Sequence, residues 1–328
     1  MQTLLDFLTI PFLDQPIWVW AIFLVVIGVI LELDLGLFNK KNHVIHPKES
    51  MKMCSIYAAV ACLFGGWVWY SMGAEDGMDY FTGYLIEFSL SIDNIFVISL
   101  IFSFFAIPLQ YQHRVLFYGI LGAILLRGFM IIVGAELVEK FGFILYFFGA
   151  FLLFSGIKML VKKEENENMS ENRLICFVKK HFRITEKLHE QNFFIRQKDE
   201  KTGKMLLFAT PLFLTLAVIE VSDVIFAVDS IPAIFVITQH AFIVFSSNIF
   251  AVLGLRSLYF LLADAVHRFR YLKQALAFIL IFIGSKIFLA WFGVHIPSLI
   301  SLLITLGLIS GGVIFSLYKT KTNKKEAA

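Results

Sequence analysis

Long apolar stretches, separated by short polar segments, run along almost the whole chain. Each stretch has about the 20 residues that a helix needs to cross the hydrocarbon of a bilayer. The pattern therefore predicts an all-α, polytopic membrane protein with about nine transmembrane helices. We expect them at residues 16–37, 52–71, 79–104, 114–136, 141–161, 207–236, 241–263, 271–291 and 297–318.

Lysine and arginine are concentrated in alternate connections between these helices. The first connection of that set is 38–52, and it also includes 162–206 and the tail from Lys319. The opposite set contains only Lys140. Because basic loops stay in the cytoplasm, the asymmetry predicts an outside N-terminus and a cytoplasmic C-terminus.

Composition agrees with a membrane protein and limits the chemistry. The chain is 59% hydrophobic and 16% charged, which is too little charge for a soluble protein of 328 residues. Its three cysteines form no CxxC pair, so reduced thiols are expected rather than a disulfide framework. The lipid bilayer is the expected surrounding, and neither a nucleic acid nor an organic cofactor is expected.

An internal repeat divides the chain. Asp93-Asn94-Ile95-Phe96 aligns with Asp223-Val224-Ile225-Phe226, and two further pairs follow at nearly the same offset. Those pairs are Leu126-Arg127 with Leu255-Arg256, and Gly156-Ile157-Lys158 with Gly284-Ser285-Lys286. Because each unit has an odd number of helices, the second copy is expected to be inverted in the membrane, as in secondary transporters. Chance alignment of apolar sequence is the alternative.

The repeat predicts five regions along the chain. They are the N-terminal helices (1–78), the first three-helix unit (79–161), a cytoplasmic loop (162–206), the second unit (207–291), and a last helix with a basic, disordered tail (292–328). Within the loop, 193–196 and 205–208 flank Thr202-Gly203 and predict a short hairpin. The loop is either a solvated linker or a surface for protein partners.

Two of the predicted helices contain acidic residues at membrane depth. A carboxylate there costs several kcal/mol and usually marks an ion pathway or a buried pair. In the third helix Glu87, Ser91 and Asn94 share one stripe, with Ser89 and Asp93 beside it. In the sixth, Glu220 and Asp223 share a face, Ser222 and Asp229 share another, and Pro232 is expected to kink or break the helix.

These side chains allow two interpretations. As ligands they offer only carboxylate, amide and hydroxyl oxygens, which favour a hard divalent cation such as Mg²⁺, Ca²⁺ or Mn²⁺, with protons as natural competitors. As structural groups they would pair with Arg127 and Arg256, which also lie at depth and need partners. Asp34, near the end of the first helix, is either a solvated helix end or part of an ion entry.

The sequence also resembles a known family. LDLG, FSLSIDNIF, GILGAILLRG, FGAFLLFSGIKM, TPLFLTLAVIEVSDVIFAVDSIPAIF and VLGLRSLYFLLA are similar to segments of the TerC family of bacterial integral membrane proteins, closest to its Alx branch. The resemblance spans residues 17–318. It implies a bacterial inner-membrane location and Mn²⁺ as the exported ion. It further implies that Glu87, Asp93, Asn94, Asp223 and Asp229 are the transport residues.

Two functions from different classes remain after this reading. The first is a secondary exporter of a hard divalent cation, Mn²⁺ by resemblance, with Ser91, Glu220, Ser222, Arg127, Arg256 and Asp34 supporting the site. The second is a membrane scaffold that helps to assemble or metallate other proteins, or acts in tellurite resistance. Enzymatic activity is not expected, because the sequence shows no nucleophile–base pair and no zinc motif.

The predicted topology can be tested by cysteine-accessibility labelling. Single cysteines at positions 75 and 190 should react from opposite sides of the membrane, because the connections that contain them have opposite charge character. Labelling of both from the same side would disprove the predicted orientation.

Overall fold

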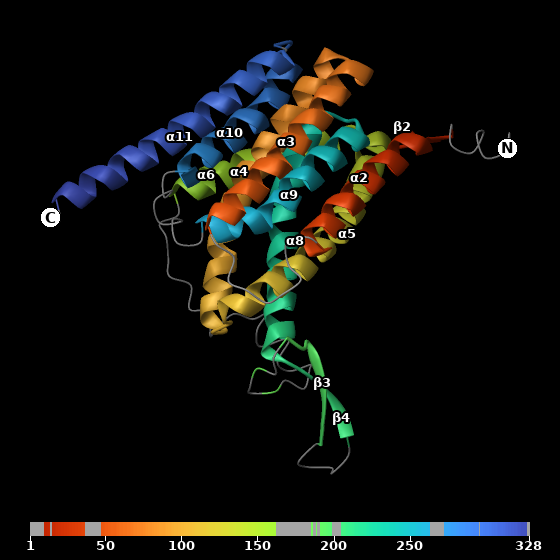
Figure 1. Ribbon diagram of the computed structural model, residues 1–328. Coiled ribbons are helices and arrows are strands. Elements are labelled where there is room, and N and C mark those ends of the chain that lie inside the picture. Colours follow the sequence, from red (N-terminus) through yellow and green to blue (C-terminus); the bar gives the residue numbers. More distant parts are fainter. Residues whose placement is uncertain are drawn as a thin grey trace.

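The computed structural model describes residues 10–13, 15–36, 47–161, 185, 188, 191–198, 205–262, 272–294 and 296–326. Helices dominate this part of the chain and form one bundle (Figure 1). They are α2 (Ile17–Gly36), α3 (Pro47–Met72), α4 (Ala74–Phe104), α5 (Leu109–Lys140), α6 (Ile144–Val161), α8 (Pro211–Ile237), α9 (Ala241–Leu262), α10 (Leu272–Trp291) and α11 (Ser298–Glu326).

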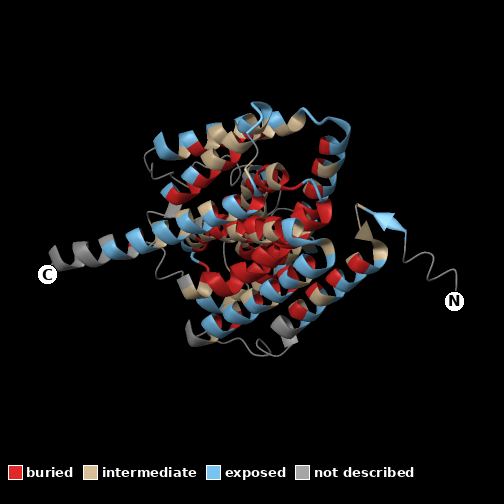
Figure 2. Cartoon of the chain, turned by 90° about the horizontal axis from the view of Figure 1, so that it is seen from above, coloured by how far each residue is buried: buried red, intermediate tan, exposed pale blue. Residues whose placement is uncertain are grey.

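The bundle has the character of a multi-pass membrane protein, as the sequence predicts. Among the described helices, eight are long and apolar enough to cross a membrane, and α2 adds a shorter apolar segment over Ile17–Glu32. Buried residues gather at the centre, whereas exposed ones lie on the outward faces (Figure 2). Those outward faces carry large apolar side chains such as Leu63, Phe129 and Phe147, as a surface in contact with lipid requires.

The predicted hairpin is present at one end of the bundle. Strands β3 (Phe194–Lys198) and β4 (Met205–Ala209) pair antiparallel, with Phe194 opposite Ala209, and the hairpin projects beyond the end of α8 (Figure 1). The predicted turn at Thr202-Gly203 lies outside the described residues. A second short pair, β1 (Pro11–Phe12) with β2 (Gln15–Pro16), precedes α2.

The structure contradicts two boundary predictions and one of the two alternatives predicted for Pro232. The sixth predicted helix begins at Pro211 rather than at residue 207, because β4 continues to Ala209 and proline suits the first helical position. Pro232 does not break α8, which continues to Ile237 with the proline buried among other helices. The segment after Lys319 is not disordered, since α11 continues as a helix to Glu326.

Glycines bring α6 and α10 into close contact. A methyl group added at Gly284 would lie 2.7 Å from the carbonyl oxygen of Gly149, and one at Gly156 would lie 2.8 Å from the carbonyl oxygen of Ala277. Close approach through small residues is a common way for helices to associate in membranes, where apolar surface alone gives no driving force. Any larger residue at these positions would force the two helices apart.

The helix contacts have the arrangement that a two-fold relation would give. Helices α4, α5 and α6 each pack against their counterpart in the second unit, namely α8, α9 and α10. The glycine contacts follow the same rule, because Gly149 corresponds to Ala277 and Gly156 to Gly284 at an offset of 128 residues, which exchanges one contact with the other. These observations support the inverted repeat, which stays a prediction until the axis is demonstrated.

Enlarging Gly284 should destabilise the bundle. We expect Gly284→Ala to lower stability by about 1–3 kcal/mol, a typical cost of overpacking, because its methyl group would meet backbone that cannot move independently. Thermal unfolding of the detergent-solubilised protein would measure the loss. Gly311→Ala in α11 is the control, since nothing lies within 4 Å of its added methyl group. Equal melting temperatures for the two variants would disprove the close crossing.

Candidate functional site

A buried guanidinium joins four helices at the centre of the bundle. Arg127 of α5 is 1% exposed and donates from Nε and Nη2 to the two carboxylate oxygens of Asp223 of α8, at 2.9 and 2.7 Å. Its Nη1 donates to Glu87 of α4 and, at 3.1 Å, to the Oδ1 atom of Asn248 of α9. Asn248 closes the network by donating from Nδ2 to the second oxygen of Glu87, at 3.0 Å.

The network explains how charge is tolerated at this depth. Glu87 and Asn248 are fully buried, and the side chain of Asp223 is 12% exposed. Each carboxylate faces the same cation, and the two-point contact between Arg127 and Asp223 has the fork geometry that favours arginine over lysine. Removing one member of such a network leaves uncompensated charge in the interior of the bundle, so the members depend on one another.

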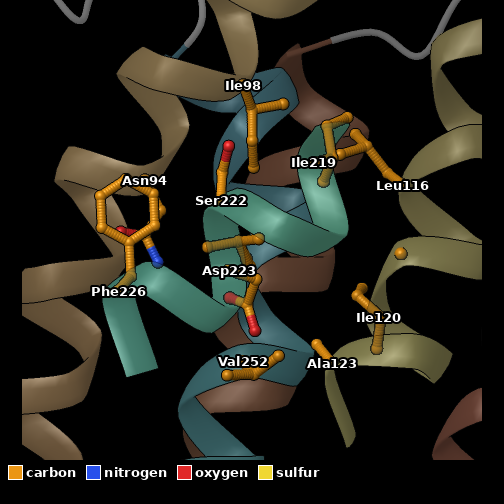
Figure 3. Close-up of a pocket in the computed structure, with 12 residues that line it drawn as sticks. Asn94, Ile98, Leu116, Ile120, Ala123, Ile219, Ser222, Asp223, Phe226 and Val252 are labelled. Atoms are coloured by element: carbon orange, nitrogen blue, oxygen red, sulfur yellow. The ribbon is translucent and has the colours of Figure 1, made fainter. Parts of the chain in front are cut away.

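A small cavity adjoins the network on the side of Asp223. It has a volume of about 20 Å³ and lies between α4, α5, α8 and α9. Figure 3 shows Asp223 in the middle of its wall, with Asn94 on one side and Ile120 and Ala123 on the other. The space suits about one water molecule or one small cation.

The polar side chains of the cavity wall carry oxygen atoms that can coordinate a cation. Asn94 is 3% exposed, and its Oδ1 atom has no hydrogen-bond partner. Ser222 also lines the cavity and donates its proton to the carbonyl oxygen of Val218, which leaves its lone pairs available. Together with Asp223 they offer carboxylate, amide and hydroxyl oxygens, which hard divalent cations prefer.

Other predicted residues lie close to this centre. Glu220 is one helical turn from Asp223, and its carboxyl group occupies the space that a side chain at Gly122 would need. The Oε2 atom of Glu220 is buried and has no hydrogen-bond partner. The hydroxyl oxygen of Ser91 is likewise buried and unpaired. Glycine at position 122 therefore makes room for a third carboxyl group between α5 and α8.

Some predicted residues are not brought together by the described structure. Arg256 of α9 is 3% exposed and contacts the Nε2 atom of His113 at 2.9 Å, away from the Arg127 network. The side chains of Asp34, Asp93 and Asp229 lie outside the described residues. Among the side chains that are described, no group of three or more His, Cys, Asp or Glu residues is placed to hold a metal ion. The ion site predicted from five residues therefore stays a prediction.

Asn248 is the member of the network that the sequence reading missed. It follows Ser246 and Ser247 in α9, a mainly apolar helix that also carries Arg256. The rule that selected the acidic residues, which treats polar groups at membrane depth as functional, would have selected this asparagine as well. The signal was weaker because asparagine carries no charge.

Comparison with known proteins places the chain among bacterial membrane proteins. The profile of the integral membrane protein TerC family matches residues 72–327. A protein of Rickettsia felis described as "Uncharacterized membrane protein" is 45% identical over 300 residues, which cover 92% of this chain and 97% of the relative. An Escherichia coli K12 protein described as "Putative membrane-bound redox modulator Alx" is 43% identical over 299 residues, covering 88% of this chain and 91% of the relative. No solved structure matches.

Loss of the central guanidinium should strongly destabilise the protein. We expect Arg127→Gln to cost about 3–5 kcal/mol, because Glu87 and Asp223 would keep their charges inside the bundle without a cation. Arg127→Lys should be intermediate, since an ammonium cannot make the two-point contact with Asp223. Chemical unfolding in detergent measures both variants.

The matched control is Lys140→Gln. Lys140 forms an exposed ion pair with Glu136 on the same helix, and the loss of such a pair should not change stability measurably. If Arg127→Gln were as stable as this control, the network would not be what holds the four helices together.

Proposed function

The chain belongs to the TerC family of integral membrane proteins, and we propose that it is a secondary transporter exporting a hard divalent cation rather than an enzyme. The observation that supports the proposal most is a buried pair of carboxylates at the centre of a membrane bundle, beside a mainly apolar cavity whose polar wall residues are Asn94, Ser222 and Asp223. Groups of this kind at membrane depth are costly and usually mark an ion pathway. Mn²⁺ is the cargo that the family resemblance implies.

Arg127 has the role of an internal competitor in this proposal. Its guanidinium lies between Glu87 and Asp223, where it supplies the positive charge that the two carboxylates need. A divalent cation that enters beside Asn94 and Asp223 would compete with Arg127 for Asp223. The contact between Arg127 and Asp223 is therefore the element whose breaking would accompany cation binding.

Charge balance suggests how export is coupled. Glu87 and Asp223 both face the guanidinium of Arg127, and Glu220 brings a third carboxyl group to within one helical turn of Asp223. Repulsion among such groups is relieved by a divalent cation or by protons, so the two should exclude each other from the site. Entry of protons as the metal leaves would drive export from the cytoplasm of a bacterial cell across its inner membrane, with the C-terminus on the cytoplasmic side.

A membrane scaffold is the second candidate, and two observations favour it. The Arg127 network is well paired in itself, as a purely structural network would be. The projecting hairpin also exposes Phe194, Met205 and Leu207, which are 44%, 64% and 60% accessible. A surface of this kind could dock another protein through the 162–206 loop.

The redox role named for the Escherichia coli relative finds no support in the described cysteines. Cys54 and Cys62 lie on one helix, α3, eight residues apart. Their Cα atoms are thus separated by about 12 Å along the helix axis, which is too far for a disulfide. A dithiol–disulfide cycle within this pair is therefore not part of the proposal.

Transport can be tested with the purified protein in liposomes that contain a Mn²⁺-sensitive dye. The wild-type protein should carry Mn²⁺ across the membrane, and an opposing proton gradient should accelerate it. Asp223→Asn and Asp93→Asn should each abolish the flux, because asparagine preserves the shape of the side chain and removes its charge. Size-exclusion chromatography before reconstitution confirms that the variants are folded.

Glu136→Gln is the control, since Glu136 is an exposed residue in a surface ion pair, and it should transport at the wild-type rate. If the folded aspartate variants carried Mn²⁺ as well as this control, the proposed central site would be wrong. No flux from the wild-type protein would favour the scaffold instead.

A further inference from the structure

The segment that leads into the hairpin is attached to the start of α8. Residues 191–194 reach β3 at the end of the bundle where α8 begins (Figure 1). Thr210, the residue before α8, donates its backbone N–H to the carbonyl oxygen of Phe193 at 2.9 Å. Its hydroxyl group donates to the carbonyl oxygen of Asn192 at 2.7 Å. These two hydrogen bonds fix the backbone of the segment relative to α8.

The same segment is also attached to α5. The Nη1 atom of Arg114 donates to the Oε1 atom of Gln191 at 3.0 Å, and the guanidinium group lies 5.5 Å from the ring centroid of Phe193. The ring of Tyr118 meets the ring of Phe193 edge to face, with the centroids 5.2 Å apart. Cation–π and edge-to-face contacts are both attractive in this geometry. Phe193 therefore holds α5 through its side chain, while its backbone is bound to Thr210.

Helices α5 and α8 are thus joined at two separate levels. One level is the ion pair between Arg127 and Asp223. The other is the segment 191–194, whose last ring, that of Phe194, also lies 4.5 Å from the ring of Phe213 in α8. Phe213 and Asp223 are ten residues apart, which is about 15 Å along the helix axis. A cation that displaced Arg127 from Asp223 would therefore leave the second junction intact.

Apolar packing fills the bundle between the cavity and this second junction. Leu116 and Ile219 line the cavity and also belong to an apolar cluster that extends to Leu212 in the first turn of α8. Phe193 packs against the same cluster. A cation cannot pass closely packed apolar side chains, because it would lose its water without gaining ligands. Passage at this end requires α5 and α8 to separate, which the segment 191–194 opposes.

We propose that Phe193, through its contacts with Arg114 and Tyr118, is a latch that closes this end of the bundle to ions. The inference rests on the proposed function, because a latch matters only if ions reach the cavity. Arg114 is half-buried and Tyr118 is 42% exposed, and cation–π contacts at such positions are weak enough to open and close. In the orientation expected from the sequence this end faces the cytoplasm, so the latch controls the entry of cargo.

The first experiment measures the labelling of a buried cysteine and does not depend on transport. Leu116→Cys, in a protein without the native cysteines, places a thiol in the cavity wall at a position that is 2% exposed. Adding Phe193→Ala should make this thiol react several-fold faster with a water-soluble maleimide, because the starts of α5 and α8 separate more often. Arg114→Gln should have a smaller effect in the same direction, since the contact between Tyr118 and Phe193 remains. Phe129→Ala, which removes an outward-facing ring of α5, is the control and should leave the rate unchanged.

The second experiment holds the latch closed during transport in liposomes. The pair Tyr118→Cys and Phe193→Cys, in the same cysteine-free background, should carry Mn²⁺ until a short bis-methanethiosulfonate reagent joins the two thiols. The crosslink should stop the flux, and reduction of the crosslink should restore it. Glu136→Cys with Lys140→Cys is the matched control, because these exposed positions lie one turn apart on α5 and their crosslink joins no second helix. Its flux should not change.

The outcomes separate the latch from the proposed function. An unchanged labelling rate in Phe193→Ala would overturn the latch, and so would Mn²⁺ flux that continues across the closed crosslink. Faster labelling in Phe193→Ala without any flux from the wild-type protein would confirm that this contact closes the bundle and would refute transport. If Phe193→Ala failed to fold, Arg114→Gln would decide, because a labelling rate equal to that of the Phe129→Ala control would overturn the proposal.

Discussion

The structure depends on the need to neutralise charge that is buried inside the bundle. Arg127 is almost completely buried, and its guanidinium stays charged under all ordinary conditions. Glu87, Asp223 and Asn248, each from a different helix, supply the acceptors that it requires. The positions of α4, α5, α8 and α9 are therefore coupled, because a shift of any one of these helices would leave charge or hydrogen-bonding capacity unpaired.

Such a network is stable, but it can also be rearranged. If another cation satisfies Asp223, the guanidinium loses its two-point contact and the helices that carry the two groups are free to separate. The neighbouring cavity provides the space in which that exchange could begin, with Asn94 and Ser222 as further oxygen donors. The ion pair between Arg127 and Asp223 is thus compatible with transport. While it is formed it holds α5 and α8 together, and its breaking would release them.

Packing elsewhere in the bundle restricts where movement can occur. The glycine crossings fix α6 against α10, with backbone in direct contact with backbone. By contrast, α11 buries only hydroxyl residues in its described part, and most of its surface faces outward. Further along α11, Leu308 and Ile309 are partly buried and pack against an apolar cluster that contains Ile86 of α4 and Ile283 of α10.

The sequence by itself determined the class of protein, most helix positions, the hairpin and the unusual residues Glu87, Arg127 and Asp223. These follow from local rules, because hydrophobic length sets the spans and the cost of burying charge marks the exceptions. Only the tertiary structure decided which charges meet, that Asn248 joins them, and that Arg256 instead contacts His113. Pairing depends on the rotation and depth of each helix relative to its neighbours, and helical periodicity within one segment carries no information about either.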